Sequence, residues 1–154
     1  MFVKLNHVSR LLLAVAGGLS LLAVAPAYAE EEYEEVAPGY DQCIADSGYN
    51  DRAMADCTYQ AVEYWDSQLN ANYNELRQYC NELGEYEGPE VKSECLLVIK
   101  STQLVWIKYR DAMEGLVPYL SPNRGGTAES LDVSSAMLQI VQDQANLLKL
   151  QEIE

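Results

Sequence analysis

Four cysteines carry the clearest chemistry in this 154-residue chain: Cys43, Cys57, Cys80 and Cys95. A zinc site built from thiolates has its ligands in close pairs such as C-x2-C. The cysteines here are separated by 14, 23 and 15 residues, which does not fit that pattern. An even number of cysteines in a small exported domain predicts two disulfide bonds instead.

An export signal occupies the first 29 residues. Lys4 and Arg10 give the N-terminus a positive charge, residues 11–24 form an apolar run, and the sequence A-Y-A ends at Ala29 like a signal-peptidase site. The alternative is a retained membrane anchor, but the run is shorter than the ~20 residues that span a bilayer as a helix. We predict cleavage after Ala29 and a periplasmic or secreted bacterial protein without a membrane span.

The mature chain is strongly acidic and contains no histidine. Removing residues 1–29 takes away His7 and leaves 8 Lys and Arg against 24 Asp and Glu, a net charge of −16. Nucleic acid is excluded as a partner because its phosphates need a basic face. The absence of imidazole excludes Ser-His and Cys-His nucleophiles and most zinc sites. We therefore expect no metal and no cofactor.

Carboxylate pairs are the remaining candidates for catalysis. Glu82 with Glu85 and Glu90 with Glu94 lie about one helical turn apart, and glycoside hydrolysis needs two carboxylates about 5–9.5 Å apart. With 24 acidic residues, such pairs arise by chance on helix faces. No glycine-rich phosphate loop or calcium loop accompanies them. We predict that the protein is not an enzyme and assign no catalytic residue.

The apolar spacing predicts three long helices. The first helix covers residues 52–83, and Asn50 or Asp51 is expected to cap its start. Apolar residues recur in it every three or four positions, as in a helix with one buried side. They are Val62, Trp65, Leu69, Tyr73, Leu76, Cys80 and Leu83. Residues 84–89 predict a turn, with Gly84 as the C-cap and Pro89 in the first helical position.

The same apolar spacing predicts the second and third helices. The second covers residues 90–116, with Val91, Cys95, Val98, Thr102, Val105, Trp106, Tyr109, Met113 and Leu116 on its inward side. Pro118, Pro122 and Gly125-Gly126 break the pattern. The third helix begins after Thr127 as the cap and runs to about residue 153, and its inward residues are Val133, Met137, Ile140, Val141, Leu147 and Leu148.

The predicted fold is an all-α antiparallel three-helix bundle over residues 40–154. Residues 30–39 begin with the run EEEYEE and are expected to form an acidic flexible tail. Residues 40–47 are expected to form one short helical turn, which a disulfide pins to the first long helix.

The disulfide pairing follows from the helix geometry. In an antiparallel hairpin, residues at the same level have a nearly constant sum of residue numbers, and a turn at residues 84–89 places Cys80 level with Cys95 and Leu69 level with Trp106. Cys57 lies 23 residues before Cys80 on the same helix, or about 34 Å away, whereas bridged Cα atoms lie within about 7 Å. The pairs are therefore Cys43–Cys57 and Cys80–Cys95.

One motif in the second helix resembles a known family. The run Q-x2-W-x2-Y-R-D consists of Gln103, Trp106, Tyr109, Arg110 and Asp111. Cys43 and Cys57 flank the start of the first long helix, the pattern L-x3-Y-x2-L follows at residues 69–76, and Gly125-Gly126 precedes the last helix. Together these features resemble the LprI-like lysozyme-inhibitor family, small helical domains of the bacterial envelope, over residues 40–150.

The chain departs from the pattern of that family in three places. Members often carry a cysteine soon after the Y-R-D run and another in the last helix, where this chain reads A-M-E and S-S-A-M. The last helix also reads Q-D-Q at residues 142–144, where the family leads us to expect an arginine. The family pattern supplies no inhibitory residue that maps onto this chain.

Two roles are open for the motif residues. The structural role is a core aromatic with an arginine–carboxylate network that ties the helices together, and the functional role is a recognition surface. We favour the structural role because Trp106 and Tyr109 lie on the predicted inward side.

The resemblance implies a protein that binds and inhibits lysozyme. Many lysozymes are basic, so a charge of −16 would speed their encounter with this domain. Glu85, Tyr86 and Glu87 are the candidate partner contacts, because a turn with an aromatic ring between two carboxylates could enter a basic cleft. The alternative function is an envelope adaptor or structural protein with a different protein partner. The sequence does not predict the oligomeric state.

Overall fold

The computed structural model describes residues 34–149, and the secondary structure in this part of the chain consists of helices joined by turns, without a strand. Its four helices are α1 (Tyr40–Asp46), α2 (Asp51–Glu87), α3 (Pro89–Leu120) and α4 (Glu129–Leu148). The all-α class is confirmed, but the number of helices is four because the segment expected as a single turn is a helix of its own. The predicted signal peptide at residues 1–29 lies outside the described residues.

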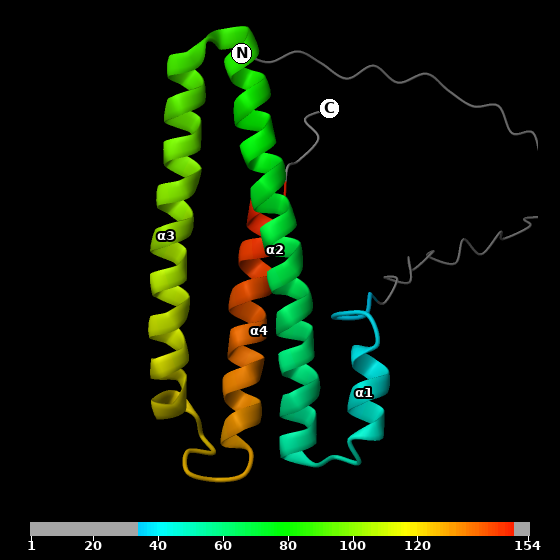
Figure 1. Cartoon of the computed structure of the whole chain (residues 1–154). Coiled ribbons are helices and arrows are strands. Elements are labelled where there is room, and N and C mark those ends of the chain that lie inside the picture. Colours follow the sequence, from blue (N-terminus) through cyan, green and yellow to red (C-terminus); the bar gives the residue numbers. More distant parts are fainter. Residues whose placement is uncertain (1–33, 150–154) are drawn as a thin grey trace, which may run out of the picture. The chain divides into compact units, whose positions relative to one another are not determined.

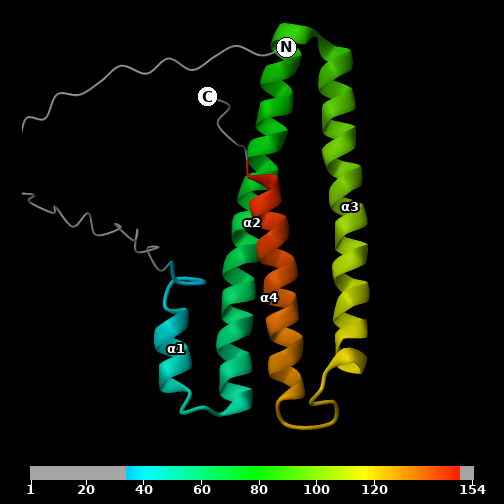
Figure 2. The ribbon, with the colours of Figure 1, turned by 180° about the vertical axis from the view of Figure 1, so that it is seen from behind.

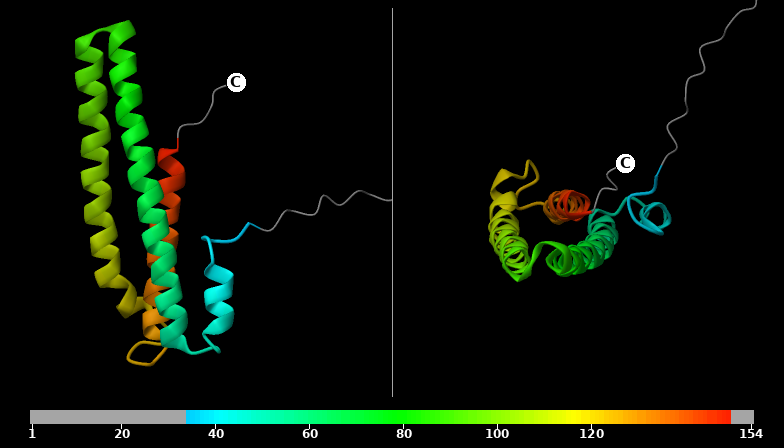
Figure 3. Two further views of the ribbon diagram at one scale, coloured as in Figure 1. Left: turned by 45° about the vertical axis from the view of Figure 1, so that its right-hand side comes forward. Right: turned by 90° about the horizontal axis from the view of Figure 1, so that it is seen from above.

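Helices α2 and α3 form a long hairpin, and α4 packs against both of them (Figure 1). Helix α1 lies beside α2, on the side away from α3 (Figures 2 and 3). The disulfide Cys43–Cys57 joins α1 to α2 with a Cα–Cα distance of 5.8 Å. The disulfide Cys80–Cys95 joins α2 to α3 with a Cα–Cα distance of 5.6 Å. Both pairs are those expected from the helix geometry.

The turn between α2 and α3 is shorter than predicted. Helix α2 continues through Gly84 to Glu87, and Gly88 alone joins it to Pro89, the first residue of α3. Gly88 has φ 108°, a conformation that side chains rarely adopt. Gly84 is not a cap: a Cβ atom added there would lie 2.5 Å from Cβ of Lys92. Glycine is therefore needed at Gly84 for the close approach of α2 and α3.

The other helix ends agree only in part with the sequence expectations. Asn50 caps α2, since its side chain accepts a hydrogen bond from the backbone N–H of Ala53 at 3.0 Å. Thr127 does not cap α4; its hydroxyl donates to Asp51 at 2.9 Å and ties the start of α4 to the start of α2. Pro118 does not end α3, which continues for two more residues to Leu120.

The main hydrophobic core lies where α2, α3 and α4 meet. Leu69, Trp106, Val141 and Ala145 form this cluster, and Leu69 faces Trp106 as the hairpin geometry predicts. A second cluster joins Ala61 of α2 and Leu138 of α4 to Ala37, which precedes α1.

This second cluster includes the end of residues 30–39, the segment predicted to be an acidic flexible tail. Ala37 is 4% exposed, and the carbonyl oxygen of Val36 accepts a hydrogen bond of 2.7 Å from the Trp65 indole. These two residues follow the glutamate run and are apolar, so burying them against α2 is favourable.

The inward face of α3 is rotated relative to the prediction. Trp106 and Val117 are buried, whereas Val98, Val105, Tyr109 and Leu116 are 45–67% exposed. Apolar residues occupy more than one side of α3, so their spacing alone did not identify the side that faces α2 and α4. In α4, Leu147 is likewise exposed rather than inward, while Leu138 and Ala145 are buried.

Leu69 provides a test of the core. It is 1% exposed, so Leu69→Ala should lower the free energy of unfolding by about 2–5 kcal/mol, since it leaves a cavity among three helices. Leu97→Ala is the matched control, because Leu97 is 66% exposed on α3 and its truncation should change stability by less than about 0.5 kcal/mol. Urea unfolding measures both, and similar losses for the two variants would contradict this core.

Candidate functional site

The family motif lies in the middle of α3 and contributes to the core. Trp106 is 8% exposed and belongs to the main cluster. Oε1 of Gln103 is buried and has no hydrogen-bond partner among the described residues. Tyr109 is 51% exposed, so it does not share the inward position that the sequence predicted for it together with Trp106.

Arg110 connects the motif to α2. Its guanidinium lies 5.3 Å from the centre of the Trp106 ring, and its Nε and Nη2 atoms donate to one carboxylate oxygen of Asp111 at 3.0 and 2.8 Å. Its Nη1 atom lies 3.9 Å from a carboxylate oxygen of Asp66 on α2. This geometry favours the structural role of the motif, although Arg110 and both carboxylates remain partly exposed, so the ion pairs add little stability.

A groove of about 360 Å³ opens beside Arg110 between α2, α3 and α4. Val62, Met137 and Val141 give it apolar walls, and Tyr59 and Glu114 contribute polar groups. Burial and the nearby charge of Glu114 raise the pKa of the Tyr59 hydroxyl. The phenol therefore stays protonated and is a hydrogen-bond donor rather than a base.

The far end of the hairpin is a separate candidate site. We call residues 76–99 the hairpin end; it contains the turn at Gly88 and the Cys80–Cys95 disulfide. Asn72 donates a hydrogen bond of 2.8 Å to the carbonyl of Ala145, and α4 ends three residues later. The hairpin end therefore extends beyond α4 (Figures 1 and 3).

The hairpin end is acidic and carries exposed aromatic rings. It contains five glutamates and only two cations, Arg77 and Lys92. Glu85, Tyr86 and Glu87 form the last turn of α2 rather than a loop, and Tyr86 is 88% exposed. Tyr79 is 48% exposed. The disulfide fixes the two helices to each other, so this surface is rigid before any partner binds.

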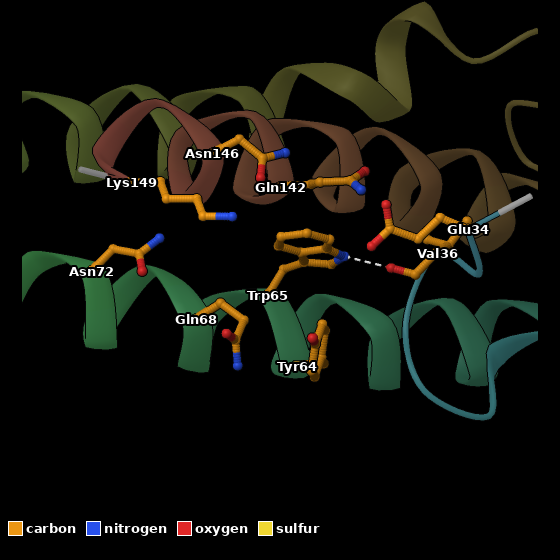
Figure 4. Close-up of a pocket in the computed structure, with 9 residues that line it drawn as sticks. All are labelled: Glu34, Val36, Tyr64, Trp65, Gln68, Asn72, Gln142, Asn146 and Lys149. Atoms are coloured by element: carbon orange, nitrogen blue, oxygen red, sulfur yellow. Dashed lines mark hydrogen bonds between the residues drawn. The ribbon is translucent and has the colours of Figure 1, made fainter. Parts of the chain in front are cut away.

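A polar pocket of about 390 Å³ lies between α2 and α4 (Figure 4). Side-chain amides from both helices line it: Gln68 and Asn72 from α2, and Gln142 and Asn146 from α4. Trp65 lies between the two helices, Lys149 lies at one end and Glu34 at the other. The pocket is not among the features predicted from the sequence. In the sequence, the two amide residues of each helix are four positions apart. That spacing does not show that the two pairs lie in one pocket, because this depends on how α2 and α4 align.

The sequence of this chain matches a known protein family. The family model described as "Lysozyme inhibitor LprI" matches residues 43–148. The chain belongs to the LprI family. The match includes both disulfides, the motif on α3 and the hairpin end, so the LprI relationship covers nearly the whole described fold. No curated protein and no solved structure matches this LprI chain.

Within residues 34–149, none of the LprI helices is long and apolar enough to cross a membrane. The same residues contain no cluster of three His, Cys, Asp or Glu side chains that could hold a metal ion.

The two helical glycines of the hairpin provide a test of the hairpin end. Gly84→Ala should lower the free energy of unfolding by about 1–3 kcal/mol, because the new methyl group would overlap Lys92 and push α2 and α3 apart. Gly115→Ala is the matched control: nothing lies within 4 Å of its added Cβ, so the better helix propensity of alanine should stabilise the protein by about 0.5–1 kcal/mol. Chemical denaturation measures the free energy of unfolding of both variants. Equal stabilisation by the two substitutions would show that the helices do not approach closely at Gly84.

Proposed function

We propose that this protein is exported and that it binds and inhibits a lysozyme-type muramidase by forming a protein–protein complex. The observation that carries the proposal is the match of residues 43–148 to the lysozyme-inhibitor family. In this proposal the protein has no catalytic activity of its own, and its partner is a basic protein.

The hairpin end is the proposed contact surface. Its glutamates oppose the positive charge common among lysozymes, which accelerates association and orients the complex. Tyr86 is 88% exposed and is the proposed anchor, because tyrosine at the centre of an interface often supplies much of the binding free energy. The rigidity of the hairpin end lowers the entropy lost on binding.

Export through the signal sequence, with cleavage after Ala29, is part of the same proposal. Two disulfides and no free cysteine among the described residues suit an oxidising compartment outside the cytoplasm. Such a compartment is also where a muramidase would meet the protein.

An envelope adaptor with a different partner is the second candidate. It is supported by the same exposed surface, since acidic charge and an exposed tyrosine do not by themselves specify a lysozyme. The two functions differ in one observable: an adaptor leaves the lysis of peptidoglycan unchanged.

Lysis of a peptidoglycan suspension by a panel of lysozymes tests the proposal. The purified mature protein should protect the suspension in a dose-dependent way, and protection should weaken as salt rises because salt screens the attraction between the two proteins. A polyanion of similar charge is the control for nonspecific effects. Absence of protection across the panel would favour the adaptor, and salt-independent affinity would contradict electrostatic steering.

The contact residues are tested by variants of the hairpin end. Tyr86→Ala should weaken inhibition by about 30-fold, the effect of losing an interface anchor worth about 2 kcal/mol. Glu85→Gln with Glu87→Gln should mainly slow association. Tyr49→Ala and the double variant Asp56→Asn, Asp143→Asn are the matched controls, because they remove an equally exposed tyrosine and equal charge elsewhere. Equal losses in the controls would place the contact outside the hairpin end.

The Cys80–Cys95 disulfide is tested by replacing both cysteines with alanine. A closed loop of this length contributes about 3 kcal/mol, so residues 76–99 should lose protection from hydrogen exchange and inhibition should weaken by at least about tenfold. Replacing Cys43 and Cys57 by alanine should lower stability but leave inhibition nearly unchanged. Full inhibition without the Cys80–Cys95 bond would show that a rigid hairpin end is not required.

A further inference from the structure

We propose that the polar pocket between α2 and α4 binds a short peptide with free termini. The pocket lies on the α2–α4 side of the fold and contains no residue of the hairpin end, although Asn72 is one helical turn from its start. The proposal is independent of the proposed inhibition. The proposal combines three features: paired amides on two helices, opposite charges at the two ends, and a matching length.

The first feature is the arrangement of the amides. Gln68 and Asn72 are four residues apart on α2, and Gln142 and Asn146 are four residues apart on α4. Residues four apart lie on one face of a helix, and all four residues line the same pocket, although the Gln68 amide is turned away from α4 in Figure 4. The result is two pairs of amides on opposite walls.

Most of these amides are available to form hydrogen bonds with a ligand. Asn72 uses its N–H in the bond to the Ala145 carbonyl, which leaves its oxygen as an acceptor. The side chains of Gln68, Gln142 and Asn146 make no hydrogen bond with any described residue. A primary amide can donate to a carbonyl and accept from an N–H at once, which is what an extended peptide backbone offers at each residue.

The charges at the two ends favour a peptide with free termini. Lys149 can bind a carboxylate at one end of the pocket, and Glu34 can bind an ammonium group at the other (Figure 4). No carboxylate of the described residues forms an ion pair with Lys149. A peptide bound with its C-terminus at Lys149 and its N-terminus at Glu34 satisfies both charges.

The length of the pocket indicates about three residues. Gln142 lies beside Glu34 (Figure 4), and Lys149, which directly follows α4, is seven residues further along the chain. At 1.5 Å per residue this is about 10 Å, which an extended peptide covers with about three residues of 3.3 Å each. The volume of about 390 Å³ is at the lower end of the roughly 300–1,000 Å³ of ordinary small-ligand sites.

A sugar fits the pocket less well, although amide-rich sites also bind sugars. Sugar sites commonly offer the face of an aromatic ring, but Trp65 packs against both core clusters. Its indole N–H is already bonded to the carbonyl of Val36 at 2.7 Å. The ring therefore forms part of the wall, and the free hydrogen-bonding groups belong to the amides.

Titration of the ¹⁵N-labelled mature protein with trialanine tests the proposal, with NMR detection of the side-chain amide signals. Trialanine should shift the signals of Gln68, Gln142 and Asn146 and bind with a dissociation constant on the order of 1 mM, as ordinary ligand efficiency gives for this size. N-acetyl-trialanine amide, which lacks both terminal charges, should bind at least about tenfold more weakly because the contacts to Lys149 and Glu34 are lost.

Matched variants make the test specific. The double variant Gln142→Ala, Asn146→Ala should weaken trialanine binding by at least about tenfold, whereas Gln139→Ala, which removes an exposed amide bonded to Asp143 on α4, should leave it unchanged. Thermal unfolding followed by circular dichroism checks that both variants are folded, and both should still inhibit lysozyme. Loss of inhibition alone would therefore bear on the hairpin end and not on the pocket.

Three results would overturn the proposal. The first is the absence of shifts in the pocket amides with trialanine, and the second is equal binding of the blocked peptide. The third is tighter binding of N,N′-diacetylchitobiose than of trialanine at the same amides, which would assign the pocket to a sugar.

Discussion

A single glycine determines how α2 and α3 align in their hairpin. Gly88 joins helices of 37 and 32 residues without a loop, so α2 must return directly along α3. Every facing pair then follows from that turn: the residue numbers add up to 175 for Cys80 with Cys95 and for Leu69 with Trp106, and to 176 for Asp66 with Arg110. The disulfide, the core and the ion pair between α2 and α3 all depend on this one register.

The length of α4 divides the hairpin into two parts. Where α4 covers it, α2 and α3 share a three-helix core, and a polar pocket forms between α2 and α4. Beyond α4, only two helices remain and they bury little apolar surface, so the Cys80–Cys95 disulfide and the close approach at Gly84 replace the missing core. A protein that binds a partner can use this arrangement, because the uncovered part is accessible and is held together by the disulfide.

The sequence predicted those features that depend on local spacing. The apolar stripe of α2 and both disulfide pairs follow from helix periodicity and the limited reach of a cysteine bridge. The side of α3 that faces α2 and α4 could not be predicted in this way. Leucine, isoleucine and valine lie on several sides of α3, and only its contacts with α2 and α4 determine which side is buried. Gly84 was interpreted as a cap, since a glycine near a proline fits a turn as well as a close contact between helices.

For the candidate sites too, local features could be predicted from the sequence and long-range ones could not. Glu85, Tyr86 and Glu87 were expected to be exposed because they are near a turn, and Tyr86 is indeed exposed at the end of α2. The amides of the polar pocket could not be grouped from the sequence, because Gln68 and Gln142 are 74 residues apart and meet only through the alignment of α2 and α4. Long-range alignment of this kind is a property of packing, which a single sequence does not display.

The order of the cysteines has a consequence for how the chain matures. Each disulfide joins cysteines that are consecutive in the chain, 14 and 15 residues apart. A polypeptide that emerges into an oxidising compartment from its N-terminus therefore presents Cys57 to Cys43 before either later cysteine appears, and Cys95 then finds only Cys80 unpaired. Oxidation in order of emergence yields the native bonds directly, so maturation requires an oxidant but no reshuffling of wrong pairs.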